Sequence, residues 1–308
     1  MSSGAVVEPG VLDPEPLRPI EEEEEARPPS AWRTILGSLE GRIGLVFGAI
    51  MLGIIAFGRF FTPYSPTELG VGPQATGPSA DHFLGTDNLG RDVFSRFLVG
   101  GDTIVLVPLA AVTVAFLVGG GLGMLGAYSR GRTDGLITRL FDLLLTLPPL
   151  LLVLVIIAGL GTSKVVLVLT VALVFVPRVG RIVRGATQAV VTSDFIAAAQ
   201  ARGERTGSIL AREVLPNIAA PAIADFALRI TYGVIFVATL NFLGLGAQPP
   251  KPDWGLMVAE SRNFLSVAPW ATLGPAFGIA ALSISFNMIA DALTRHLTRE
   301  AARGIVPV

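Results

Sequence analysis

The sequence predicts an all-α integral membrane protein with about six transmembrane helices, on three observations. Of the 308 residues, 51% are hydrophobic and only 15% are charged, whereas soluble domains carry about 25% charged residues. The mean hydropathy is +0.64. Several windows of about 20 residues carry no charge, which is the length that crosses a hydrocarbon core of about 30 Å. This composition excludes a soluble globular domain and an outer-membrane barrel of short alternating strands.

Charge and composition exclude further classes of protein. The net charge of −1 argues against a nucleic-acid binder, which needs a dense basic patch. The chain has no cysteine and only two histidines, His82 and His296, so thiol chemistry and zinc fingers are excluded. No P-loop motif occurs, and Gly121-x-Gly123-x-x-Gly126 lies in an apolar helix with no strand before it, where small-residue helix packing is expected. We expect no catalytic residue, metal or cofactor.

The elements follow from the charge-free windows. Residues 1–41 are rich in Pro and Glu and predict a disordered acidic tail without a signal peptide. A first helix and a long outer loop follow over 42–100, a helical core over 101–298, and a second tail over 299–308. The fourth helix reaches spanning length only if it continues past Pro177. The expected spans are residues 43–61, 103–128, 143–163, 165–182, 218–246 and 264–290.

The distribution of Arg and Lys sets the expected orientation. With the N-terminus inside, the inner segments 1–42, 129–142, 178–217 and 294–308 hold 16 of the 23 basic residues, and the outer segments hold six. Both termini of this multi-pass cell-membrane protein are therefore expected to face the cytoplasm. The long connections, the outer one from residue 62 to 102 and the inner one from 185 to 217, suggest functional loops.

The inner loop predicts a helix–turn–helix on the cytoplasmic surface. Residues 194–202 are good helix formers that Ser193 or Asp194 can cap, and Gly203 suits a left-handed residue at the helix end. A second short helix is expected over 206–213. The spacing alone leaves two interpretations open: an amphipathic element that packs on the bundle, or a docking element for another protein.

The motif Ala198-Ala199-x-x-x-Gly203, followed by Leu215-Pro216, resembles the EAA loop of ABC importer permeases. The resemblance implies that this loop docks into a cleft on a cytoplasmic ATPase and transmits its closure. The glutamate that names the motif is replaced here by Ala197. The expected ATPase-coupling residues are Asp194, Ala197, Ala198, Ala199, Gly203, Leu215 and Pro216, with the next spanning helix beginning near the proline.

The outer segment 82–96 resembles the signature of dipeptide and oligopeptide permeases of the DppC/OppC type. Physically, its glycines permit turns, Asp87 or Asn88 can cap a short helix, and Asp92 and Arg96 are spaced for an ion pair. Either a structural role or substrate contact fits this segment. The candidate residues are Gly85, Thr86, Asp87, Gly90, Arg91, Asp92 and Arg96.

The resemblance covers about residues 42–298 and implies the fold of a type I ABC importer permease with a cytoplasmic coupling helix. It implies import of di- or oligopeptides together with a homologous permease, two cytoplasmic ATPase domains that use ATP, and an extracytoplasmic substrate-binding protein. Related permeases carry nickel or other small solutes, and this alternative stays open.

Five polar residues inside or near the spans are candidates for the translocation path or for bundle packing: Asp142, Asp225, Arg229, Asn287 and Asp291. Polar groups at this depth must face protein or water. Asp225 and Arg229 are four residues apart and can pair on one helix. They are interpreted either as a structural pair or as part of an inner vestibule.

Arg178, Arg181 and Arg184 recur every three residues, as in a voltage sensor, which makes a six-helix channel subunit the rival from another class. A sensor needs acidic partners on other helices, and a potassium-type channel also needs a filter resembling Thr-Val-Gly-Tyr-Gly, which is absent. An intramembrane hydrolase is disfavoured because both histidines fall outside the expected spans.

Overall fold

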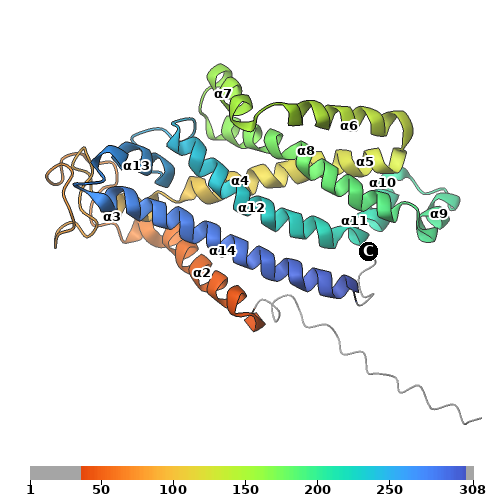
Figure 1. Ribbon diagram of the computed structural model, residues 1–308, viewed down its shortest axis with the longest axis horizontal. Coiled ribbons are helices and arrows are strands. Elements are labelled where there is room, and N and C mark those ends of the chain that lie inside the picture. The colour runs from red at the N-terminus through yellow and green to blue at the C-terminus, as the bar shows by residue number, and fades with distance from the viewer. Residues whose placement is uncertain (1–35, 303–308) are drawn as a thin grey trace, which may run out of the picture.

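The computed structural model describes residues 36–302, which form an elongated helical bundle (Figure 1). No strand occurs among these residues; their one bridge pairs Thr86 with Asp92. Five helical segments are long and apolar enough to cross a membrane, and a bent helix pair makes a sixth. The prediction of an all-α membrane protein with about six spans is confirmed.

The first span is helix α2 (Leu39–Phe57), extended by the 3₁₀ turn η1 (Gly58–Phe60). The side chain of Ser38 accepts from the backbone N–H of Gly41 at 3.0 Å and caps α2. The helix therefore begins inside the expected tail of residues 1–41, most of which lies outside the described residues.

The last span, α14 (Pro269–Ala302), runs beside α2 (Figure 1). Ser285 of α14 donates a hydrogen bond to the carbonyl oxygen of Gly44 at 2.6 Å. The helix continues to Ala302, so it includes the first residues of the expected tail 299–308.

The centre of the bundle holds three long helical segments. The first joins α3 (Val93–Val99), α4 (Asp102–Ala115), the π-helical turn η2 (Phe116–Gly120) and α5 (Gly121–Ser129); the others are α8 (Lys164–Val190) and α12 (Ala219–Phe242). Fully buried side chains at their contacts include Ile104, Val112, Val171, Val179 and Val234.

The backbones of η2 and α5 approach α8 closely at two glycines. A Cβ atom on Gly119 would lie 2.3 Å from the carbonyl oxygen of Val176, and one on Gly123 would lie 2.4 Å from that of Gly180. No other residue fits there. Of the predicted glycine run, Gly123 has this packing role, whereas a Cβ atom on Gly121 would meet nothing within 4 Å.

The expected span over residues 143–163 is wrong as a single helix. The chain instead forms α6 (Gly131–Thr146) and α7 (Pro149–Leu160), bent by 87°. Pro148 prevents the preceding Leu147 from staying helical, and Leu147 is extended at φ −81° and ψ 127°. The expected inner connector 129–142 is consequently most of α6.

Helix α8 passes through Pro177 and continues to Val190, beyond the expected end at residue 182. A proline inside a helix removes one backbone hydrogen bond but does not have to end the helix. Basic residues assigned to inner connectors therefore lie on bundle helices: Arg132 and Arg139 on α6, and Arg178, Arg181 and Arg184 on α8.

The two long connections lie at opposite ends of the bundle (Figure 1). One end carries the irregular loop 62–92 with α13 (Trp254–Ser261) and the turn η4 (Arg262–Phe264). The other end carries α9 (Asp194–Ala201), α10 (Thr206–Ile209), the π-helical turn η3 (Leu210–Val214) and α11 (Leu215–Asn217).

Candidate functional site

The inner helix–turn–helix is formed as predicted, with Gly203 at its turn. Gly203 has φ +71°, the left-handed conformation that glycine adopts without strain. Its N–H donates to the carbonyl oxygen of Gln200 at 2.9 Å, and the N–H of Glu204 donates to that of Ala199 at 3.2 Å. These two bonds form a Schellman motif, which satisfies the last carbonyls of α9.

The start of α9 differs from the prediction in one respect. Ser193 is the N-cap residue, but neither its side chain nor that of Asp194 makes a capping hydrogen bond. The expected start of the next span at Pro216 is also shifted, since Pro216 lies in the short α11 and α12 begins only at Ala219.

Helix α9 presents two different faces. Ile196 and Ala199 are buried against the bundle, as are Ile209 and Val214 of the following turns. The other expected coupling residues, Asp194, Ala197, Ala198, Gly203, Leu215 and Pro216, are exposed at the end of the molecule. An exposed face of small side chains beside a tight turn is suited to contact with another protein.

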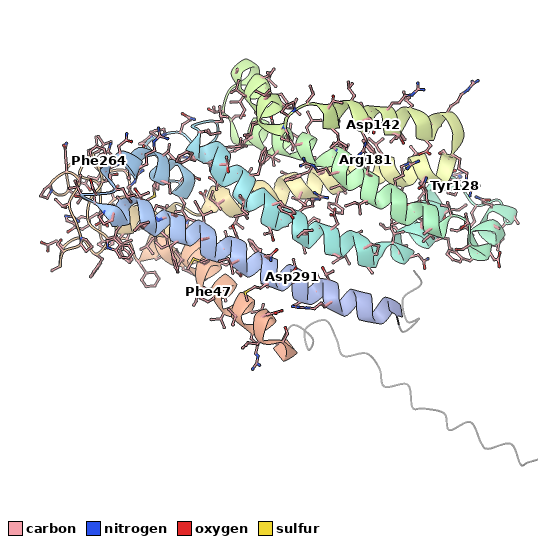
Figure 2. All side chains as sticks on the ribbon, in the orientation of Figure 1. Phe47, Tyr128, Asp142, Arg181, Phe264 and Asp291 are labelled. Atoms are coloured by element: carbon pink, nitrogen blue, oxygen red, sulfur yellow. The ribbon has the colours of Figure 1, made fainter. Side chains whose placement is uncertain are left out.

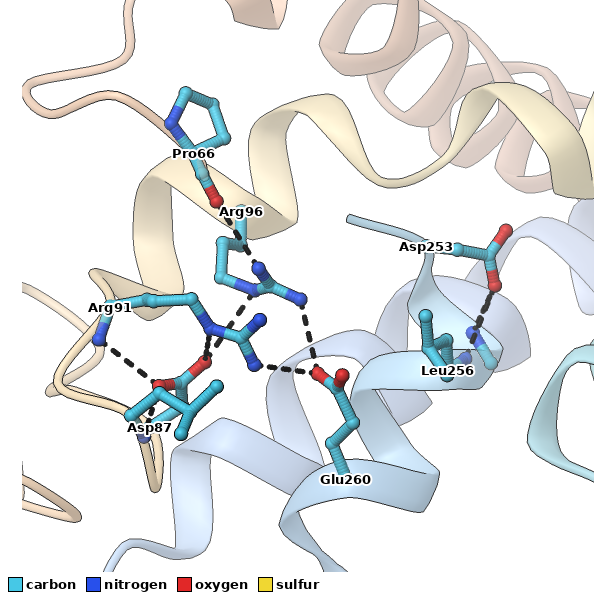
Figure 3. A network of polar contacts seen from close by, with 9 residues as sticks. Pro66, Asp87, Arg91, Arg96, Asp253, Leu256 and Glu260 are labelled. Atoms are coloured by element: carbon cyan, nitrogen blue, oxygen red, sulfur yellow. Dashed lines mark hydrogen bonds and ion pairs between the residues drawn. The ribbon is translucent and has the colours of Figure 1, made fainter. Parts of the chain in front are cut away.

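The outer signature forms a buried charge cluster. Arg91 donates to Asp87 at 2.5 Å and to Glu260 of α13 at 2.7 Å, and Arg96 donates to the same Glu260 oxygen at 3.1 Å (Figure 3). Two positive and two negative side chains thus compensate each other and join the outer loop to α13. Arg96 also donates to the carbonyl oxygen of Pro66 at 3.2 Å.

Two expectations for this signature are wrong. The cap of α3 is Asp92, which accepts from the backbone N–H of Ser95 at 2.8 Å, rather than Asp87 or Asn88. Asp92 also contacts the Nδ1 atom of His82 at 2.9 Å and makes no ion pair with Arg96. An ion pair with the predicted spacing of four residues does form in this segment, but it joins Asp87 and Arg91.

Gly85, Thr86 and Gly90 hold the shape of this loop. Both glycines have positive φ, and a Cβ atom on Gly85 would lie 2.1 Å from the carbonyl oxygen of Thr76. Thr86 is fully buried, and its hydroxyl contacts that of Thr76 at 2.7 Å. These contacts support the structural interpretation of the signature.

Sequence reasoning missed Asp253, Asn241 and Glu260. Asp253 is fully buried, caps α13 by accepting from the N–H groups of Gly255 and Leu256, and accepts from Asn241 at 2.9 Å. Burial raises the pKa of Asp253 from 3.8 to about 6. An Asp directly before the apolar residues 254–258 is a readable cap signal, whereas nothing local indicates that Glu260 meets residues 91 and 96.

The expected intramembrane polar residues form separate contacts rather than one site. Asp225 and Arg229 pair on α12 at 3.1 Å, as predicted. Asn287 donates to Asp291 on α14 at 3.3 Å. Asp142 of α6 contacts Arg181 of α8, and Figure 2 shows this pair on the opposite side of the bundle from Asp291.

The bundle has cavities at two places that bear on the site. One, of about 460 Å³, lies at the end that carries the outer loop and includes Asp102, Lys164 and Lys251 in its lining. The other, of about 480 Å³, lies between α7, α8 and α12 and includes Arg178 and Arg229.

Comparison with known proteins agrees with this architecture. The chain is 37% identical to the dipeptide transport system permease protein DppC of Alkalihalophilus pseudofirmus over 287 residues, 92% of this chain and 94% of the relative. It is 33% identical to the glutathione transport system permease protein GsiD of Pectobacterium atrosepticum, covering 85% of this chain and 87% of the relative. The GsiD protein of Escherichia coli O6:K15:H31 is 34% identical, over 89% of this chain and 92% of the relative.

The helical fold with its apolar spans defines a multi-pass membrane protein. The model of one family of such proteins matches residues 119–303. The chain belongs to this family, the binding-protein-dependent transport system inner membrane components, which is a transport family rather than an enzyme family. Its members act in ABC importers with ATPase and substrate-binding partners.

Proposed function

We propose that the chain imports di- and oligopeptides, forming the translocation path with a second, homologous permease. The relatives that support this proposal are named as dipeptide and glutathione permeases, and they match along nearly the whole chain. Two cytoplasmic ATPase domains bind and hydrolyse ATP, and an extracytoplasmic protein delivers the substrate. The chain itself performs no bond chemistry.

The coupling element of this importer is the α9–α10 hairpin, and the observation that carries the assignment is its exposed tip. Ala197 and Ala198 are exposed on α9 at the end of the bundle, and Gly203 closes the turn. In this proposal the tip enters a cleft on an ATPase. Closure of the ATPases then displaces α9 and moves the permease between inward-open and outward-open states.

In this proposal the outer end of the bundle receives the substrate-binding protein. The cluster of Asp87, Arg91, Arg96 and Glu260 fixes the loop 62–92 to α13, so the binding protein meets a preformed surface. In the proposed orientation, the outer loop faces the outside of the cell, and the hairpin and both chain termini face the cytoplasm.

The proposal is tested by reconstituting the chain in proteoliposomes with a second permease, two ATPase domains and a substrate-binding protein. We expect saturable, ATP-dependent uptake of radiolabelled di- and oligopeptides. Glutathione and nickel serve as the alternative substrates. ATP-dependent uptake of nickel without uptake of any peptide would contradict the peptide assignment.

A further inference from the structure

Three arginines project from α8 at intervals of three residues, and two of them have carboxylate partners on α6. Arg184 donates to both oxygens of Asp134, at 2.6 and 2.7 Å. Arg181 contacts Asp142, and Figure 2 shows the two side chains between the helices. Asp134 and Asp142 thus neutralise the arginines nearest the hairpin end of α8.

The third arginine, Arg178, lies beside the end of α6, where Leu144 and Leu145 line a small pocket with it and supply no carboxylate. Helix α6 ends at Thr146, and the chain turns by 87° at Pro148 into α7. Among the side chains that the structure describes, none forms an ion pair with Arg178. The break in the third span therefore leaves one arginine of the series uncompensated.

Arg178 lines the cavity of about 480 Å³ between α7, α8 and α12, a volume within the range of small-molecule sites. Arg229 lines the same cavity but is held by Asp225 at 3.1 Å. The cavity consequently carries one net positive charge. Its apolar walls come from Phe175, Tyr232, Ile235 and Phe236, among others.

The position of Arg178 makes this charge costly unless a ligand or water meets it. It lies 14 residues after Lys164, or about 21 Å along α8, well inside a span. An arginine inside a spanning helix is costly in lipid, so such residues face protein or a water-filled cavity. A guanidinium facing a cavity is suited to bind a carboxylate through two parallel hydrogen bonds.

We propose that Arg178 is an intramembrane station for the free carboxylate of a peptide in transit. The inference rests on the proposed function in peptide import. The carboxylate at the C-terminus is common to all unmodified peptides, whereas their side chains vary. One guanidinium for the constant group and aromatic and aliphatic walls for the variable groups therefore suit a site that accepts many peptides.

The station is tested by equilibrium binding to the assembled complex of both permeases and the ATPases in nanodiscs, without the binding protein. The probes are one tritiated dipeptide and the same dipeptide with its C-terminus amidated. A charge-assisted hydrogen-bond pair is worth at least about 1.5 kcal/mol, so we expect the wild-type complex to prefer the free acid about tenfold or more.

The variants separate this role from assembly. Arg178→Gln is expected to abolish the preference for the free acid, and Arg178→Lys to retain part of it. Arg181→Gln, three residues further along α8 and already paired with Asp142, is expected to retain all of it.

Equal binding of acid and amide by the wild-type complex, or an unchanged preference in Arg178→Gln, overturns the station. If peptide uptake in the complete system proceeds despite that result, the proposed function stands and only the station fails. Absence of ATP-dependent uptake of any peptide in the complete system contradicts the proposed function instead.

Discussion

Gly203 closes the hairpin with φ +71°, in open space. A side chain there meets no neighbour within the chain, but a β-branched residue in this conformation is strained by about 1–2 kcal/mol. We therefore expect Gly203→Val to reduce co-purification of the ATPases and substrate-stimulated ATP hydrolysis, while membrane insertion and pairing with the second permease are retained.

Gly207 provides the matched control, because it is also exposed and has open space around it but does not have a positive φ. Gly207→Val should leave ATPase association close to wild type. If both valine variants behave alike in an assembled complex, the conformation of Gly203 is irrelevant to coupling.

The second prediction concerns how the stability of the folded protein depends on pH through Asp253. Its pKa is raised to about 6 because burial disfavours the carboxylate, so the folded state binds the proton more tightly than the unfolded state does. Its contribution to stability is full below about pH 4 and is lost as the pH rises through about 6, by roughly 3 kcal/mol in total.

The thermal midpoint of the purified complex is therefore expected to carry a component that falls between pH 4.5 and pH 7, in scans of intrinsic fluorescence. Asp253→Asn should remove that component. Asp81→Asn, at an exposed position, should keep it. An identical pH dependence in wild type and Asp253→Asn would show that the carboxyl titrates at an ordinary pKa.

At the scale of elements, the sequence predicted those features whose causes are local. The hairpin depends on helix-forming residues before Gly203 and on the conformational freedom of glycine, and both are visible within ten residues. The pair of Asp225 and Arg229 likewise needs only helical spacing. The cap at Asp92 was missed because the choice among several acidic residues depends on where the folded loop turns.

The bend between α6 and α7 had a readable signal that hydropathy concealed. Residues 143–163 carry no charged side chain, yet Pro148 and Pro149 together exclude a straight helix there. The contact of Glu260 with Arg91 and Arg96 joins residues more than 160 positions apart. No single-sequence pattern reports such a contact.

The two faces of α9 give an element-scale prediction. Ala197 is exposed, so Ala197→Glu adds a carboxylate that reaches solvent or the partner, and ATPase association should be retained. Ala199 is fully buried, so Ala199→Glu places a charge against the bundle and should displace the hairpin. Co-purification of the ATPases measures both; loss in the Ala197 variant alone would reverse the assignment of the faces.

At the scale of the whole molecule, the proposed orientation is tested by cysteine labelling, for which the chain has no native background. Ala80 in the outer loop and Ala211 after the hairpin are both exposed, at opposite ends of the bundle. A membrane-impermeant maleimide added to intact cells should label Ala80→Cys and spare Ala211→Cys. In inside-out vesicles the pattern should be inverted; labelling of Ala211→Cys in intact cells would reverse the topology.

The glycine contacts of η2 and α5 with α8 have a mechanical consequence. Backbone contacts backbone at Gly119 and Gly123, so no side chain lies between the helices there that could change rotamer when a force is applied. The hairpin stands at the end of this stiff stem, and its Gln200 reaches the hydroxyl of Tyr128 on α5 at 3.2 Å. We therefore expect a displacement of α9 to tilt α5 and α8 together as one rigid body. The part of α8 that moves includes Gly180 and, about half a turn away, Arg178.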